Sequence, residues 1–284
     1  MFTNLISAAD LQSLMQGSAP WLLFDVGFDL TNASAGERAL REGHLPGAHY
    51  VHLDTHLCGP KTGRNGRHPL PDRTQFAATV GQFGVAPQTQ VVIYDRQGAM
   101  YSGRLWWMLR WLGHGAVAVL DGGVDAWQRA GGTLTTDTTP LRAAPPYPAA
   151  DLASLAHAST VTADEVQAQI GKRPVFDARA GERFRGETEP LDAQAGHIPG
   201  ARNRFFKDNL AADGRFKPAD QLRAEFTALL GPAAPQTAIS QCGSGVTACH
   251  NLLAMDVAGL HGAALYPGSW SEWSSDPARP IAVG

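Results

Sequence analysis

The sequence predicts an α/β protein with two tandem domains, in which each domain is a mainly parallel sheet flanked by helices. Short apolar runs alternate with longer amphipathic segments along the chain, which is typical of repeated strand–helix units. The chain also contains an internal repeat, because EGHLPGA at residues 42–48 recurs as AGHIPGA at residues 195–201. This period is far too long for a solenoid and indicates two homologous domains.

Four apolar runs predict central strands, two in each half. They are residues 22–25 (LLFD), 91–95 (VVIYD), 174–177 (PVFD) and 237–241 (TAISQ). Amphipathic segments predict helices at residues 102–112 and 219–230, and another from residue 246 to residue 253. Near the end of each repeat, residues 120–127 (LDGGVDAW) match residues 266–273 (YPGSWSEW), at the same offset of 146 that relates residues 91–95 to residues 237–241.

These repeats place the N-terminal domain at residues 1–135 and the C-terminal domain at residues 159–284. Residues 136–158 form the predicted linker, because the sequence there is rich in Thr, Pro and Ala and predicts irregular chain.

The composition describes a globular protein and excludes several classes of partner. The 284 residues are 44% hydrophobic and 17% charged, with a formal net charge of −3. This balance gives no basic footprint for nucleic acid, and no apolar run is long enough to span a bilayer. The N-terminus has no signal-peptide pattern. We therefore expect a cytoplasmic protein with neither a nucleic-acid nor a membrane partner.

Three cysteines, Cys58, Cys242 and Cys249, occur without disulfide-framework or metal-ligand spacing. A reducing compartment fits this pattern, and we expect no metal and no organic cofactor. Cys249 lies two helical turns beyond Cys242 and is interpreted as a packing residue.

The segment QCGSGVTA at residues 241–248 carries the clearest chemical signal. It places Cys242 between a predicted strand and a predicted helix, in a loop whose glycines let backbone N–H groups turn inward. Both features favour the thiolate, which is the nucleophilic form of cysteine. A lone cysteine is also often a small buried hydrophobic residue, and spacing alone leaves both interpretations open.

Phosphate chemistry is disfavoured at this loop. Phosphate-binding loops end in Gly-Lys-Ser/Thr, and no lysine follows here. Cysteine phosphatases require an arginine about five residues beyond the cysteine, where this chain has Thr247. At the offset of 146, Cys242 corresponds to Arg96, so the first domain has lost the nucleophile.

Taken together, these motifs resemble the two-domain rhodaneses. The resemblance rests on the duplicated Gly-His-Leu/Ile-Pro-Gly-Ala, the C-terminal cysteine loop and the Gly-Gly/Gly-Ser…Trp segments, and it covers nearly the whole chain. In that family, thiosulfate sulfurtransferases have basic residues after the cysteine, whereas 3-mercaptopyruvate sulfurtransferases have Cys-Gly-Ser-Gly-Val-Thr. Residues 242–247 match the second type at all six positions.

The resemblance also implies roles for individual residues. Ser244, His68 and Asp54 correspond to the family's proton relay, and Arg183 corresponds to its substrate-binding arginine. The loop residues Gly243, Gly245, Val246 and Thr247 would bind the substrate sulfur through their backbone. Taken alone, His68 could be a surface histidine, Asp54 a turn or cap residue, and Arg183 a member of an ion pair with Glu182 or Glu187.

One position departs from the family pattern. The second arginine, expected in a Glu-Pro-Arg stretch, is replaced by Leu191 in EPLD at residues 189–192. Arg185 is the candidate that compensates for it.

The predicted function is transfer of sulfane sulfur from a small-molecule donor, 3-mercaptopyruvate, through a Cys242 persulfide, with release of pyruvate. The acceptor would be a small thiol, thioredoxin or cyanide. One alternative is a thiosulfate sulfurtransferase, and another is a non-catalytic persulfide carrier. The intact cysteine loop disfavours a purely structural role.

Overall fold

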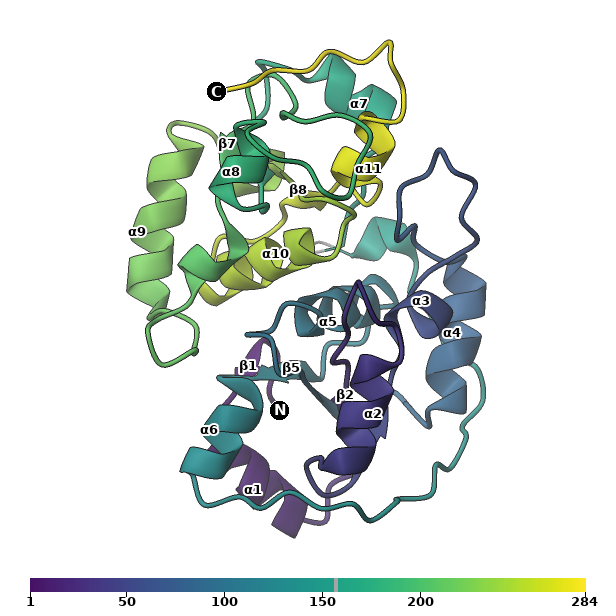
Figure 1. Ribbon diagram of the computed structural model, residues 1–284. Helices are drawn as coiled ribbons and strands as arrows, with labels where there is room; N and C mark the ends of the chain where they lie inside the picture. Colours follow the sequence, from purple (N-terminus) through teal and green to yellow (C-terminus); the bar gives the residue numbers. More distant parts are fainter. Residues whose placement is uncertain (156–157) are drawn as a thin grey trace. The chain divides into compact units, whose positions relative to one another are not determined.

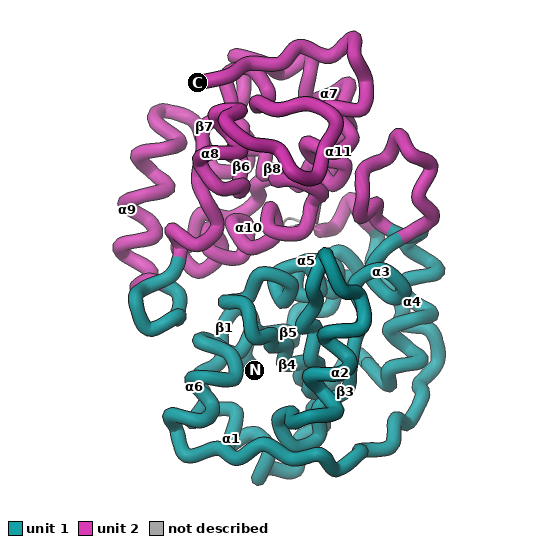
Figure 2. Tube along the Cα trace, viewed as in Figure 1, with its two compact units in different colours: residues 1–58, 71–151, 210–216 teal, residues 59–70, 152–209, 217–284 magenta. Residues whose placement is uncertain are grey.

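The computed structural model describes residues 1–155 and 158–284 (Figure 1). The described chain forms two compact units (Figure 2). Unit 1 comprises residues 1–58, 71–151 and 210–216, and unit 2 comprises residues 59–70, 152–209 and 217–284. Each unit therefore contains one short segment from the other half of the sequence. Residues 156–157 of the predicted linker lie outside the described residues.

The described part of unit 1 contains a five-stranded sheet in the order β1-β5-β4-β2-β3, in which all pairs are parallel. The strands are β1 (Leu5–Ile6), β2 (Trp21–Asp25), β3 (Ala48–Tyr50), β4 (Gln90–Tyr94) and β5 (Val117–Leu120). β4 is buried along its whole length, as expected for a parallel strand covered on both faces. The predicted parallel α/β architecture is confirmed.

Helices connect these strands and cover the sheet of unit 1. They are α1 (Ala8–Gln16), α2 (Ala35–Glu42), α3 (Leu53–His56), α4 (Arg73–Gln82), α5 (Ser102–Trp111) and α6 (Gly123–Arg129). Side chains satisfy free N–H groups at some helix starts. Ser7 accepts a hydrogen bond from the Asp10 N–H at α1, and Asp72 accepts from Thr74 and Gln75 at α4.

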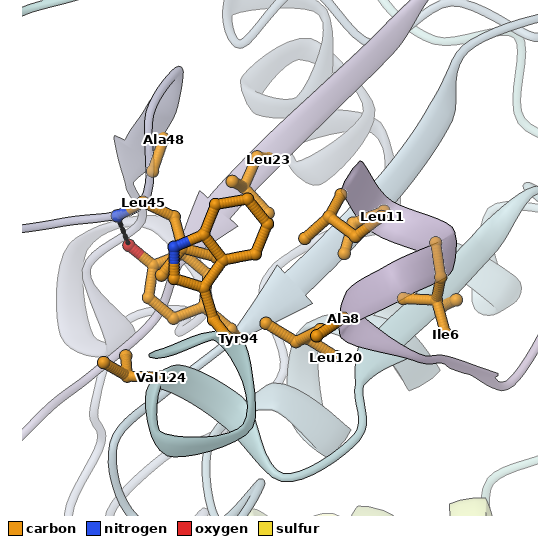
Figure 3. Close-up of a cluster of buried hydrophobic side chains, with 12 residues drawn as sticks. Ile6, Ala8, Leu11, Leu23, Leu45, Ala48, Tyr94, Leu120 and Val124 are labelled. Atoms are coloured by element: carbon orange, nitrogen blue, oxygen red, sulfur yellow. Dashed lines mark hydrogen bonds between the residues drawn. The ribbon is translucent and has the colours of Figure 1, made fainter. Parts of the chain in front are cut away.

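A cluster of buried apolar side chains joins the sheet of unit 1 to α1 and α6 (Figure 3). Leu23 on β2 belongs to this cluster and is fully buried. Tyr94 contributes its ring to the cluster, and its hydroxyl accepts a hydrogen bond from the Leu45 N–H at 3.3 Å. Burying an aromatic ring whose polar end is hydrogen-bonded keeps the core free of an unsatisfied hydroxyl.

Unit 2 repeats this topology on a smaller scale. Its four-stranded parallel sheet has the order β7-β6-β8-β9 in the described residues. The strands are β6 (Val175–Asp177), β7 (Arg202–Asn203), β8 (Ile239–Gln241) and β9 (Ala264–Leu265). A single parallel bridge between Thr160 and Leu265 stands where β1 pairs with β5 in unit 1.

The helices of unit 2 are α7 (Ala163–Ala168), α8 (Gly181–Phe184), α9 (Ala219–Leu230), α10 (Thr247–Val257) and α11 (Ser269–Trp273). Short 3₁₀ turns occur at η1 (Leu152–Ser154), η2 (Phe206–Asn209) and η3 (Pro235–Thr237). α7 begins with a capping box, in which Thr162 and Glu165 satisfy each other's backbone N–H groups. Trp270 and Trp273 of α11 are fully buried in the core of this unit.

Two predicted elements have different bounds in the structure. The strand predicted at residues 237–241 begins only at Ile239, because η3 occupies the residues before it, and Pro235 has no N–H for a strand ladder. The helix predicted to end at residue 253 continues to Val257, since apolar residues recur through Met255.

Much of the predicted linker is irregular but anchored to unit 1. Backbone N–H groups of Ala144, Tyr147 and Ala150 donate to carbonyls of α4 and of the α5 C-terminus. The ring of Tyr147 is buried, and its hydroxyl lies 3.0 Å from His114 Nδ1. Residues 144–150 are therefore held against unit 1 by these hydrogen bonds.

Truncating the core of unit 1 tests this description of its packing. Leu23→Ala is expected to lower the free energy of unfolding by about 2–5 kcal/mol, because it removes buried methyl groups and leaves a cavity. Leu30→Ala, at a side chain that is 42% exposed, is expected to change it by less than about 0.5 kcal/mol. Urea unfolding of the two variants measures the difference, and equal effects would contradict the assigned core.

Candidate active site

Cys242 follows the last residue of β8 and lies at the carboxyl end of the unit 2 sheet. β8 ends at Gln241, and α10 begins at Thr247, so five residues form the connecting loop. Cys242 is 2% exposed, and Ser244, Val246 and Thr247 are also buried. Open parallel sheets bind their ligands at this edge. The predicted strand–loop–helix context of the cysteine is confirmed.

Gly245 gives the loop its shape. Its φ is +76°, and a Cβ at this position would lie 2.3 Å from the carbonyl oxygen of Pro267. Any side chain would therefore strain the backbone and displace the neighbouring segment.

Residues 269–271 hold the backbone of Cys242 and Gly243. The Cys242 N–H donates to Ser269 Oγ at 3.1 Å, and the Cys242 carbonyl accepts from the Trp270 N–H at 3.0 Å. The Gly243 carbonyl accepts from the Ser271 N–H at 2.8 Å. These three bonds fix the orientation of the loop at the position of the sulfur.

Ser244 and His68, which are 176 residues apart in the sequence, are hydrogen-bonded within unit 2. His68 Nδ1 lies 2.7 Å from Ser244 Oγ, and both side chains are buried. The pair joins a titratable ring to a hydroxyl two residues beyond the cysteine. This geometry is suited to moving a proton.

The segment that carries His68 is tied to α11 and to its own turn. The Arg67 N–H donates to Ser271 Oγ at 3.0 Å, and the Gly59 N–H donates to the carbonyl of Pro69 at 3.0 Å. Gly66 adopts a φ of +82°, and a Cβ there would lie 2.7 Å from the carbonyl oxygen of Gly268. The close backbone approach at this glycine fixes the residues just before His68.

Two guanidinium groups lie beside the cysteine loop. A Cβ at Gly243 would lie 3.1 Å from Arg67 Nη2 and 3.5 Å from Arg183 Nη1. Arg67 Nη1 forms an ion pair with Asp192, and Arg183 Nη2 contacts Glu189 at 2.6 Å and Asp192 at 3.2 Å. Asp192 and Glu189 thus bind Nη1 of Arg67 and Nη2 of Arg183, while Nη2 of Arg67 and Nη1 of Arg183 lie nearest to Gly243.

The charges of this cluster act on one another. Burial lowers the pKa of Arg67, and the positive charge of Arg183 lowers it further. Negative charge at Cys242 and at Glu189 acts in the opposite direction. Arg67 stays protonated, as arginines in proteins do, and its charge is favoured by an anion at the cysteine.

The other candidate arginine points elsewhere. Arg185 forms two hydrogen bonds to Glu187, at 2.6 and 3.0 Å, and both side chains are about half exposed. Leu191, at the position of the expected family arginine, is exposed, and its backbone N–H donates to Glu189. The structure therefore brings Arg183 to the loop but not Arg185. The ion pair of Arg183 is with Glu189 and Asp192, rather than with Glu182 or Glu187.

Asp54 belongs to unit 1, where it lies in the first turn of α3. Its backbone N–H donates to His52 Nδ1 at 3.1 Å. Because His68 and Ser244 belong to unit 2, the part of Asp54 in the relay stays a prediction.

The matching loop of unit 1 shows how the repeat diverged. Arg96, at the position of the cysteine, turns away to form an ion pair with Asp25 and to donate to the carbonyl of Gly43. The carboxylate of Asp95 accepts hydrogen bonds from the backbone N–H groups of Gln97, Ala99, Tyr101 and Ser102. In unit 1 the Asp95 side chain therefore accepts hydrogen bonds from the N–H groups of its own loop.

Unit 2 has a neutral residue at the corresponding position. Gln241 replaces Asp95, and its side chain is fully buried without a hydrogen-bond partner in the described structure. Ala99 and Gly245 also correspond, and they share a left-handed backbone, with φ of 63° and 76°. The loop of unit 2 has the same turn but no carboxylate, so its N–H groups can receive another negative group.

Comparison with known families agrees with this duplicated architecture. A family model described as Rhodanese-like domain matches the chain twice, at residues 7–130 and 162–276. The chain belongs to the rhodanese family. As predicted from its motifs, this rhodanese has two domains of the family fold and is a sulfurtransferase.

Relatives of this rhodanese carry both activities that the motifs suggested. It is 45% identical over 267 residues to a Pseudomonas aeruginosa protein named "Probable 3-mercaptopyruvate sulfurtransferase", covering 93% of this chain and 92% of the relative. It is 35% identical over 283 residues to the thiosulfate sulfurtransferase of Cricetulus griseus, with coverages of 96% and 92%. The solved structure of 3-mercaptopyruvate sulfurtransferase from Leishmania major superimposes with a TM-score of 0.82 and 28% identity, covering 96% of this chain and 74% of that one.

Two residues beside the loop were missed by sequence reasoning. Arg67 precedes His68 directly, so a basic residue next to a predicted relay histidine was an available signal. Ser269 was visible only as part of the duplicated tryptophan segment. Its contact with Cys242 depends on a turn that the sequence does not reveal.

Among residues 1–155 and 158–284, no group of three His, Cys, Asp or Glu side chains is arranged to hold a metal ion. None of the helices in these ranges combines the length and apolar character needed to cross a bilayer.

Charge at position 241 is expected to control the reactivity of Cys242. In Gln241→Asp, a carboxylate can occupy the loop N–H groups, as Asp95 does in unit 1, and it also repels a thiolate. We expect persulfide formation on Cys242 to slow about 100-fold, the scale seen when oxyanion-hole donors are lost. Gln241→Asn, which has the same shape without charge, is the control. Stopped-flow measurement of persulfide formation compares them, and equal rates would contradict this role of the loop.

Proposed function

We propose that this sulfurtransferase takes sulfur from 3-mercaptopyruvate through a persulfide on Cys242. The observation that carries the proposal is the 2.7 Å contact between His68 Nδ1 and Ser244 Oγ in the loop of the cysteine. Thiosulfate needs no proton at its leaving group, because sulfite departs as a stable anion. The leaving group of 3-mercaptopyruvate is an enolate, which must gain a proton to become pyruvate. A buried hydroxyl–imidazole pair therefore suits the second donor better.

The first step forms one bond and breaks one. The thiolate of Cys242 attacks the donor sulfur, and an S–S bond forms as the bond between the donor sulfur and C3 breaks. The electron pair of that bond passes into the enolate of pyruvate. The proton lost by the donor thiol is the one that C3 gains, and Ser244 with His68 can relay it. Asp54 is proposed to orient His68 in this relay, as an acid orients histidine in related triads.

The two arginines are proposed to position the donor. Its carboxylate would bind the N–H groups of Arg67 and Arg183 that face Gly243, since guanidinium groups match carboxylates with paired hydrogen bonds. Arg67 thereby replaces the arginine that the family carries at the position of Leu191.

In the second step an acceptor thiolate attacks the outer sulfur. Cys242 departs as a thiolate, so the enzyme returns to its starting state. The N–H groups of residues 243–247 would stabilise both the thiolate and the persulfide anion. We propose a small thiol or thioredoxin as the acceptor, or cyanide in the assay. A reducing cytoplasmic setting suits Cys58, Cys242 and Cys249, which form no disulfide in the described structure.

Catalysis is proposed to reside in unit 2. The predicted catalytic domain, residues 159–284, supplies the cysteine loop and Arg183, whereas residues 59–70 supply Arg67 and His68. A protein cut between the two halves would separate these groups.

Thiosulfate stays the second candidate donor because of one specific observation. Arg67 and Arg183 place two cationic groups beside Gly243, and such a pair also suits a compact dianion. The two donors differ in their need for a proton, which makes them separable by experiment.

Replacing His68 tests the choice of donor. His68→Ala is expected to lower kcat/KM for 3-mercaptopyruvate by about 100-fold, the scale of general acid–base catalysis. For thiosulfate we expect a decrease of less than about threefold, because sulfite needs no proton. Steady-state assays with the same thiol acceptor compare the donors, and Cys242→Ser supplies the blank. Equal losses of kcat/KM with both donors would contradict the proton relay. Turnover by Cys242→Ser would contradict the persulfide on Cys242.

Replacing the two candidate arginines tests how the donor is held. Arg67→Gln is expected to raise KM for 3-mercaptopyruvate about 10- to 100-fold, since hydrogen bonds to charged groups contribute about 1.5–3 kcal/mol. Arg185→Gln, a control of the same chemistry at the side chain bound to Glu187, should change KM by less than about twofold. If Arg185→Gln has the larger effect, Arg185 rather than Arg67 binds the donor.

A further inference from the structure

Ser269 combines a strained backbone with a buried hydroxyl at the cysteine. Its φ is +53°, a left-handed conformation that serine rarely adopts, and the residue is fully buried. In the described chain, Ala99 is the other residue besides glycine with a positive φ. Strain of this kind persists where the surrounding structure or a function requires it.

The repeat shows what the usual residue at this position would be. Gly123 corresponds to Ser269 at the offset of 146, and it has nearly the same φ, +54°. The turn itself can therefore be built with glycine, which adopts this conformation without strain. In unit 1 the Arg96 N–H, which corresponds to that of Cys242, donates instead to the exposed side chain of Gln97.

The hydroxyl of Ser269 links two backbone groups. It accepts the N–H of Cys242 at 3.1 Å and donates to the carbonyl of Tyr266 at 2.8 Å. The next N–H in the chain, that of Trp270, binds the Cys242 carbonyl. Ser269 and Trp270 therefore hold Cys242 from both of its backbone polar groups, in a region closed to water.

We propose that Ser269 is a positioning residue for Cys242. Its hydroxyl fixes the backbone N–H of Cys242, beside the Cα that carries the sulfur, and so aims the thiolate at the donor and at the loop N–H groups. Unit 1, which has lost the nucleophile, has glycine at this position and carries no such hydroxyl. The proposal rests on Cys242 being the nucleophile, but it does not depend on which donor the enzyme uses.

Two substitutions separate the hydroxyl from the strain. Ser269→Gly removes the hydroxyl and allows the left-handed backbone, as Gly123 does in unit 1. Ser269→Ala removes the hydroxyl and keeps the strain. Ala99→Gly relieves the same kind of strain in unit 1, away from any cysteine, and is the matched control.

Alkylation of Cys242 by iodoacetamide is the first measurement, because it reports the thiolate without any sulfur donor. Mass spectrometry of the Cys242 peptide distinguishes it from Cys58 and Cys249. We expect both Ser269 variants to react about 10- to 100-fold more slowly, the effect of misplacing a reacting group. For both donors kcat should fall by a similar factor while KM stays within twofold. Ser269→Gly should keep the urea midpoint of the wild type, and Ala99→Gly should keep its alkylation rate.

Each result decides the proposal. If Ser269→Gly alkylates and turns over like the wild type, Ser269 does not position the cysteine. If either variant has a lower urea midpoint but alkylates and turns over at the wild-type rate when folded, the hydroxyl is structural and the proposal is wrong. Failure of the proposed function looks different, because Cys242→Ser would then still transfer sulfur whatever the alkylation rates are.

Discussion

Hydrogen bonds with residues 269–271 hold the backbone of Cys242 and Gly243, and the proposed chemistry of the site depends on this contact. The parallel pairing of β8 with β9 brings the two segments together, since both follow the carboxyl ends of neighbouring strands. With the backbone of Cys242 and Gly243 fixed, the left-handed turn at Gly245 leads the loop into α10. The hydroxyl of Ser244 then meets His68, and Gly243 offers the arginines a surface without a side chain.

The two halves of the chain differ in the side chains that surround their corresponding loops. Both loops follow a buried parallel strand, and both pass through a left-handed residue. In unit 1, the Asp95 carboxylate accepts hydrogen bonds from the loop N–H groups, and Arg96 forms an ion pair with Asp25. In unit 1, therefore, charged side chains of the same unit bind the loop N–H groups and the residue at the cysteine position. Unit 2 has neutral Gln241 at the first position and Cys242 at the second, so neither position carries a carboxylate or a guanidinium group.

Sequence reasoning predicted the fold and much of the site because both depend on local patterns. Apolar runs and the repeat located β2, β4, β6 and β8, and the cysteine motif located the loop. The contacts of Arg67 and of Ser269 were not accessible in this way. Arg67 reaches Gly243 only because residues 59–70 pack with unit 2, and that packing depends on long-range contacts. The role of Ser269 depends on a positive φ that its residue type argues against. Arg185 matched the expected chemistry, but a nearer partner, Glu187, takes its guanidinium group.

The position of residues 59–70 has a consequence for biosynthesis. The segment leaves the ribosome with the first half of the chain, yet His68 contacts Ser244 and Arg67 contacts Ser271, both far along the second half. The imidazole of His68 and the guanidinium of Arg67 can therefore meet the loop only after residues 242–271 have been translated. A chain truncated before residue 242 can contain a complete first sheet and still lack the proposed site. The proposed persulfide chemistry thus requires segments from both halves of the chain.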